Sequence, residues 1–124
     1  MARARMENQP IPKVSHADVL RVIGRDFAAI PEAEVLAELD RYGAADWQRE
    51  RDRVQLAILK LADGDFAALQ QHTDVACTDY RDVLAAAEYP AYSQHGWPSP
   101  SAGAARAEMF EADWDQYRKW LQGE

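Results

Sequence analysis

Charged and aromatic side chains gather between residues 79 and 97, and they are the best candidates in the sequence for chemistry. Asp79 and Asp82 are three residues apart, a spacing that places both carboxylates on one face of a helix. If the polar groups of this region converge in a pocket between helices, they could form the site of a small enzyme or a ligand-binding protein. The candidate binding residues are Asp79, Arg81, Asp82, Glu88, Tyr89, Tyr92, His95 and Trp97.

Metal and cofactor chemistry is not expected from these residues. His72 and Asp79 are two helical turns apart, about 10.5 Å along the axis, which is too far to share one ion. The sequence has no Glu-x-x-His pair, no phosphate-binding glycine run and no nucleophile elbow. We therefore expect no metal, no cofactor and a solvated acidic face, and no residue can be assigned a catalytic role.

The single cysteine, Cys77, has two possible roles. Arg81 lies one helical turn later and could lower the thiol pKa. Cys77 also flanks the apolar positions of the same predicted helix, where a cysteine usually serves as a small buried hydrophobe. We expect the second role, because reactivity requires exposure as well as a neighbouring cation.

The segment from residue 89 to 101 combines aromatic residues with prolines. Tyr89, Tyr92 and Trp97 alternate with Pro90, Pro98 and Pro100. Rigid aromatic side chains with polar tips are enriched at binding surfaces, and prolines reduce the entropy lost on docking. The same aromatics could instead cover one end of a helical bundle. The sequence leaves both interpretations open.

The charge balance restricts the partners. Fourteen basic residues against twenty-one acidic ones give a net charge of −7, which repels the phosphate backbone of nucleic acids. Basic residues cluster only in residues 1–13, which we expect to be a flexible arm preceding one domain over residues 14–124. No stretch reaches the roughly 20 apolar residues of a membrane span, so we expect a cytoplasmic protein that binds neither nucleic acid nor membrane.

Composition and capping residues predict an all-α fold. Alanine accounts for 23 residues, whereas valine, isoleucine and threonine together account for 13, which favours helices over strands. Ser15 and Asp65 are suitable N-caps, and Gly43 and Gly64 are suitable terminators. We expect a compact single-domain bundle of about five helices, at residues 16–28, 31–42, 47–62, 66–88 and 102–121.

The third of these helices should form the centre, and the fourth has the clearest apolar pattern. Residues 54–62 contain only two polar residues, Gln55 and Lys60, and positions 66, 69, 73, 76, 80, 83 and 87 form a seam at heptad spacing. A continuous helix over residues 66–88 would be near 35 Å long. The predicted core includes Val54, Ile58, Leu61, Phe66, Leu69, Tyr80, Leu84, Phe110 and Trp114.

Residues 54–90 resemble a family of short, uncharacterised bacterial proteins. The likeness rests on Val54-Gln55-Leu56-Ala57-Ile58-Leu59-Lys60-Leu61, Asp79-Tyr80-Arg81-Asp82-Val83-Leu84 and Glu88-Tyr89-Pro90. It covers under a third of the chain. It implies a bacterial, all-helical protein and transfers no activity and no catalytic residue.

The functional expectation is a non-enzymatic protein-binding or regulatory helical module that presents the segment from Tyr89 to Trp97 and the nearby acidic face. The alternative is the small enzyme or ligand-binding protein described above. The partner would be another protein or a second copy of the chain, since the seam and the aromatic stripe of the last helix offer apolar surface for a homodimer.

Overall fold

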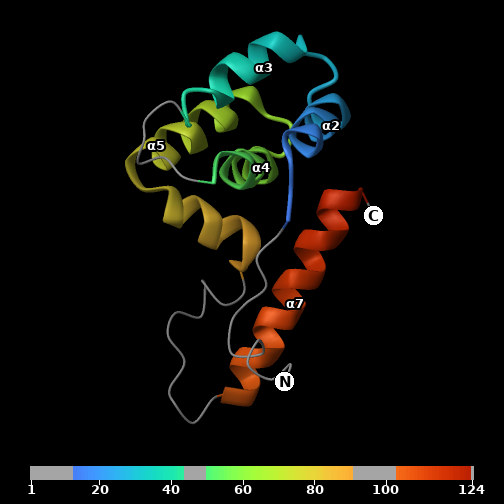
Figure 1. Cartoon of the computed structure of the whole chain (residues 1–124), viewed down its shortest axis with the longest axis vertical. Helices are drawn as coiled ribbons and strands as arrows, with labels where there is room; N and C mark the ends of the chain where they lie inside the picture. Colours follow the sequence, from blue (N-terminus) through green and yellow to red (C-terminus); the bar gives the residue numbers. More distant parts are fainter. Residues whose placement is uncertain (1–12, 44–49, 91–102, 124) are drawn as a thin grey trace.

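The computed structural model describes residues 13–43, 50–90 and 103–123. This part of the chain forms a single-domain bundle of five helices and contains no strand, and helix accounts for 79% of it. The prediction of an all-α bundle is therefore confirmed (Figure 1). The helices are α2 (His16–Asp26), α3 (Glu32–Leu39), α4 (Arg51–Ala62), α5 (Phe66–Glu88) and α7 (Gly103–Gln122).

Helices α2 and α3 begin where the sequence indicates and end slightly earlier. The backbone N–H of Ser15 donates to the Asp18 carboxylate over 3.0 Å at the start of α2. Helix α3 follows Pro31 and ends at Leu39, three residues before the predicted end. A turn in which the Tyr42 N–H donates to the Leu39 carbonyl over 2.9 Å then leads into Gly43, whose φ of 112° suits glycine.

Helix α4 lies at the centre of the bundle, as predicted. Seven consecutive residues, from Arg53 to Leu59, are buried, and Figure 1 shows α4 enclosed by α2, α3 and α5. The buried Gln55 amide donates to the carbonyls of Leu39 (3.1 Å) and Tyr42 (3.3 Å), so α4 also holds the end of α3 in place.

The start of α4 differs from the prediction. Glu50 has a φ of 51°, a left-handed conformation that excludes it from the helix, so α4 begins at Arg51 and not at residue 47. The predicted cap Asp46 lies outside the described residues. The C-terminal end is as predicted, because Asp63 and Gly64 both adopt positive φ and end the helix.

Helix α5 is broken at Asp79, which the sequence analysis placed inside one continuous helix. Asp79 has φ −152° and ψ 98°, and its carboxylate accepts a hydrogen bond from the Arg81 backbone N–H over 3.1 Å. Asp65 caps the start of α5 in the same way, accepting from the Ala67 N–H over 3.1 Å. The expectation of a single 35 Å helix is therefore wrong, because the Asp79 side chain replaces helical hydrogen bonding and starts a second helical segment.

The seam of α5 is nevertheless used for packing. Leu69, Thr73, Ala76, Val83 and Ala87 are buried. Of the predicted core residues, Val54, Ile58, Leu69 and Leu84 are buried as expected.

Four other predicted core residues are only half-buried. Leu61, Phe66 and Tyr80 lie at the edge of the core and pack against it with one side. Trp114 is also half-buried, because its part of α7 passes beside the bundle and not through it (Figure 1). The side chain of Phe110 lies outside the described residues.

We predict that Ile58→Ala lowers the free energy of unfolding by about 2 to 5 kcal/mol, because Ile58 is fully buried in the centre of α4. The matched control is Val75→Ala on α5, since Val75 is 42% exposed and its truncation should cost less than about 0.5 kcal/mol. Urea unfolding followed by circular dichroism measures both values. Equal losses for the two variants would contradict the assignment of α4 as the core helix.

We further predict that Asp79→Ala destabilises the protein by about 0.5 to 2 kcal/mol, because the second segment of α5 loses its N-cap. Asp82→Ala removes the same charge from an exposed position three residues later and should have little effect. Thermal unfolding of the two variants provides the comparison. A cost for Asp82→Ala as large as that for Asp79→Ala would show that the lost charge, and not the cap, is responsible.

Candidate functional site

The structure separates the candidate residues that the sequence grouped together. Arg81 and Asp82 are exposed, and the Arg81 guanidinium is 3.2 Å from the Asp79 carboxylate. Glu88 is buried, and Tyr89 is half-buried at the end of α5. Tyr92, His95 and Trp97 lie outside the described residues. Asp79, Arg81 and Asp82 therefore belong to a solvated face, and Glu88 does not share a pocket with them.

Glu88 instead forms a buried ion pair with Arg53 of α4. The Arg53 Nε and Nη2 atoms donate to the two Glu88 carboxylate oxygens over 2.7 and 2.6 Å. The two side chains are 10% and 4% exposed. Glu50, at the start of α4, accepts a further bond from Arg53 over 3.1 Å. The bidentate contact between Arg53 and Glu88 holds the second segment of α5 against α4.

Burial and pairing act against each other at this ion pair. Burial disfavours the charged form of Arg53, but the hydrogen bonds and charges of Glu88 and Glu50 outweigh it and raise the pKa of the guanidinium. Burial raises the pKa of Glu88, and the Arg53 contact offsets only part of that rise. The pair is therefore a structural contact whose partners depend on each other, since either charge alone would be costly in this position.

Tyr117 of α7 covers the same region. Its side chain is 1% exposed, and its hydroxyl is buried with no hydrogen-bond partner. Burial is the main cause of the raised pKa of Tyr117, and the negative charge of Glu88 adds to it. Beside it, the Gln116 amide donates to the Ala87 carbonyl over 3.3 Å. Helix α7 is thus joined to the end of α5 through polar as well as apolar contacts.

Two arginines of α2 hold the C-terminal end of α7. Arg21 donates to the Leu121 carbonyl over 2.8 Å, and Arg25 donates to the Trp120 carbonyl over 2.7 Å. The Arg25 guanidinium also lies 5.2 Å from the centre of the Trp120 ring. These cations bond to carbonyls of the last turn and complement the negative end of the helix dipole; the Trp120 carbonyl also accepts the Gly123 backbone N–H over 3.0 Å. Among the residues of α7 whose side chains are described, those that bond to the rest of the bundle lie in its last two or three turns.

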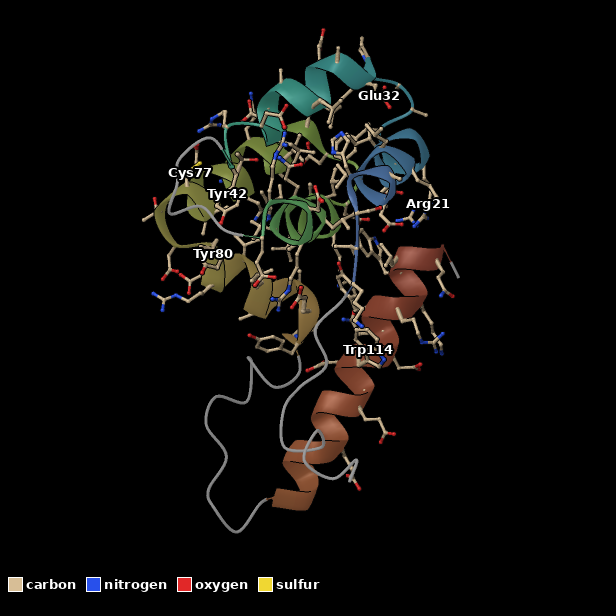
Figure 2. The ribbon with its side chains drawn as sticks, in the orientation of Figure 1. Arg21, Glu32, Tyr42, Cys77, Tyr80 and Trp114 are labelled. Carbon is tan, nitrogen blue, oxygen red and sulfur yellow. The ribbon has the colours of Figure 1, made fainter. Side chains whose placement is uncertain are left out.

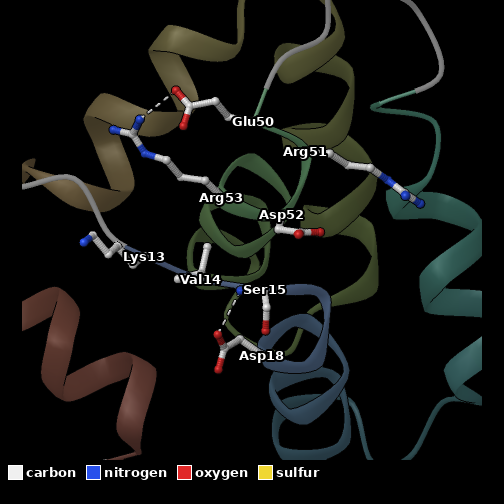
Figure 3. Close-up of a pocket in the computed structure, with 8 residues that line it drawn as sticks. All are labelled: Lys13, Val14, Ser15, Asp18, Glu50, Arg51, Asp52 and Arg53. Carbon is white, nitrogen blue, oxygen red and sulfur yellow. Dashed lines mark hydrogen bonds and ion pairs between the residues drawn. The ribbon is translucent and has the colours of Figure 1, made fainter.

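A hollow of about 670 Å³ lies between the start of α2 and the start of α4. Figure 3 shows its lining residues, which are Lys13, Val14, Ser15, Asp18, Glu50, Arg51, Asp52 and Arg53. Most of its charges already have partners. Asp18 pairs with Arg21 at 3.1 Å, and Arg51 pairs with Asp40 at 2.6 Å. The hollow is therefore lined by structural ion pairs, and its polar groups are not arranged around a reacting atom.

The remaining candidates for chemistry occupy ordinary structural positions. Cys77 is half-buried, and its thiol donates to the Arg41 carbonyl over 3.4 Å, while Arg81 is paired with Asp79. His72 is half-buried, and burial lowers its pKa. Figure 2 places Cys77 and Tyr80 at the edge of the bundle. Within the described residues, no group of histidine, cysteine and carboxylate side chains is placed to hold a metal ion.

A second hollow, of about 590 Å³, follows the side of α7. It is lined by Glu108, Glu111, Ala112, Trp114, Asp115 and Arg118, which we call the Trp114 face. This face was not predicted from the sequence, because Trp114 was expected in the core. The spacing of Glu108, Glu111 and Asp115, at three and four residues, places the three carboxylates along one side of α7 and was the available signal.

Comparison with known proteins finds no significant match to any protein-family model, curated protein or solved structure. The resemblance of residues 54–90 to short bacterial proteins therefore stays a prediction. Among the described helices, none has the length and apolar character needed to cross a membrane.

We predict that Arg53→Met destabilises the protein by about 3 to 5 kcal/mol, because it leaves the Glu88 carboxylate buried without its partner. The double variant Arg53→Met/Glu88→Leu removes both charges and should recover most of this loss. Arg81→Met breaks an exposed pair and serves as the control, with an expected cost below about 1 kcal/mol. Chemical unfolding of these three variants and of the unsubstituted protein measures the losses. A double variant less stable than Arg53→Met would contradict this account of the pair.

Proposed function

We propose that the protein is a non-enzymatic helical module that binds another protein through α7. The observation that carries this proposal is the one-sided attachment of α7. Its C-terminal half is fixed to the bundle by Tyr117 and by the two arginines of α2. Its N-terminal half extends beyond the other described helices (Figure 1). A helix that is anchored at one end and projects at the other presents a ready surface to a partner.

The exposed side chains of α7 support this role. Glu108, Glu111 and Ala112 are exposed, and Trp114, which lines the same hollow, is half-buried on α7 (Figure 2 labels Trp114). Tryptophan is the residue type most enriched among binding hot spots, and such residues are typically surrounded by polar ones. The Trp114 face has both features.

The arrangement of the described candidate binding residues favours a binding module over the alternative of a small enzyme. Asp79, Arg81 and Asp82 are solvated, whereas Glu88 is directed away from them into its ion pair with Arg53. An enzyme site would require these groups to converge around one substrate position. Among the described residues, Arg41–Asp74, Arg51–Asp40 and Arg53–Glu88 are ion pairs that join different elements of the bundle.

A second copy of the chain is the other candidate partner. Five of the seven seam positions of α5, which together with the aromatic stripe of the last helix suggested a homodimer, are buried within the bundle. Val75 is the large apolar residue that stays exposed among the described ones, at 42%. A net charge of −7 on each copy also opposes self-association. Light scattering at micromolar concentration separates the two cases: the monomer mass of 14.0 kDa supports a different partner, and twice that mass supports a homodimer.

We predict that peptides selected by the full-length protein from a random phage-displayed library bind the Trp114 face. Hydrogen exchange with and without a selected peptide should show protection at residues 108–118 and little change in α3. Trp114→Ala should weaken binding by about tenfold or more, whereas Val75→Ala should leave it unchanged. Circular dichroism of both variants confirms that they are folded.

The residues that a selected peptide protects from hydrogen exchange decide between binding through α7 and the alternative. Protection confined to the hollow between α2 and α4, or to residues 79–90, would contradict binding through α7. It would instead support the alternative of a ligand-binding protein or small enzyme.

A further inference from the structure

We propose that the Trp114 face recognises an arginine-bearing or lysine-bearing segment of a partner protein, with the cationic group seated between the Trp114 ring and the carboxylates of Glu108 and Glu111. This inference rests on the proposed function and specifies its partner. It follows from which charged groups of the face are already in ion pairs, from the position of Trp114 and from the net charge of the protein.

The carboxylates of the face differ in how they are partnered. Asp115 pairs with Arg118 at 2.6 Å and with Lys119 at 3.3 Å, and these bonds lower the pKa of Asp115. Glu108 and Glu111 carry no ion pair within the described part of the chain, and both are exposed. The face therefore offers two carboxylates that are free to pair with a cation from outside.

Trp114 supplies the second half of a cation site. It lies three residues after Glu111, so the two side chains are neighbours along one side of α7, and both line the same hollow. A guanidinium or ammonium group over an indole ring gains a cation–π interaction, and a nearby carboxylate adds a charge-assisted hydrogen bond. The protein already contains a contact of this kind, because Arg25 lies over the ring of Trp120 at the other end of α7.

The charge of the whole molecule selects a cationic partner. The net charge of −7 attracts basic segments and repels nucleic acid, and it opposes the approach of a second copy with the same face. The half-buried ring of Trp114 and the exposed Ala112 provide apolar contact. The occupant that fits is therefore a basic segment in which arginine or lysine side chains alternate with apolar ones.

The test is a titration of the full-length, isotope-labelled protein, followed by amide chemical shifts, with a short synthetic peptide of arginine, leucine and alanine at an ionic strength of about 0.15 M. The same peptide with citrulline in place of arginine keeps the shape and removes the charge. We expect the arginine peptide to shift amides of residues 108–118 and the citrulline peptide to bind at least about tenfold more weakly.

Matched double variants separate recognition from general attraction. Glu108→Gln/Glu111→Gln should weaken binding by about tenfold or more. Glu32→Gln/Glu34→Gln changes the net charge equally on the exposed side of α3, far from Trp114 in Figure 2, and should change binding less than about twofold. Equal weakening in the two variants would overturn the inference, because attraction would then be diffuse.

The outcomes also distinguish this inference from the proposed function. Equal binding of the citrulline and arginine peptides at residues 108–118 would overturn cation recognition and leave binding through α7 intact. The same conclusion would follow if the arginine peptide shifted no amide of residues 108–118 while library-selected peptides protected that region. Selected peptides that bind elsewhere would overturn both.

Discussion

The burial of α4 on all sides is the constraint on which the rest of the structure depends. A helix buried over seven consecutive residues must be enclosed by other elements, and the side-chain donors within that stretch must find acceptors there. Arg53 meets this requirement through Glu88 of α5, and the Gln55 amide does so through the carbonyls that follow α3. The positions of α3 and of the second part of α5 therefore follow from two polar side chains of the central helix.

Helix α7 contacts this core in a different way from the other helices. The core is largely apolar, whereas the α7 contact includes hydrogen bonds from the amide of Gln116 and from guanidinium groups of α2. Polar contacts of this kind resemble the interfaces between separable units more than they resemble the interior of a domain. An appended helix with one fixed end can present its other end without weakening the core, and this division of roles underlies the proposed binding function.

The sequence predicted the local features better than the long-range ones. Helical periodicity and capping residues such as Ser15, Asp65 and Gly64 are local, and they located most helix boundaries to within a few residues. Asp79 was misread because an N-cap and a candidate site carboxylate look alike in a sequence. The Arg53–Glu88 pair joins residues 35 apart, and periodicity identifies the buried side of a helix but not its partner across the core. Trp114 was assigned to the core because a large apolar side chain is usually buried. Its residue type does not show whether another helix extends far enough to cover it.

The most direct test of this account is residue-resolved native-state hydrogen exchange of the full chain. The account predicts that amides of residues 54–59 in α4 exchange most slowly, through global unfolding. Amides of residues 104–112 in the projecting half of α7 should exchange faster by at least about a hundredfold, through local opening. Equal protection of the two segments would contradict the account, because residues 104–112, which carry Glu108, Glu111 and Ala112 of the Trp114 face, would then be held as firmly as the core.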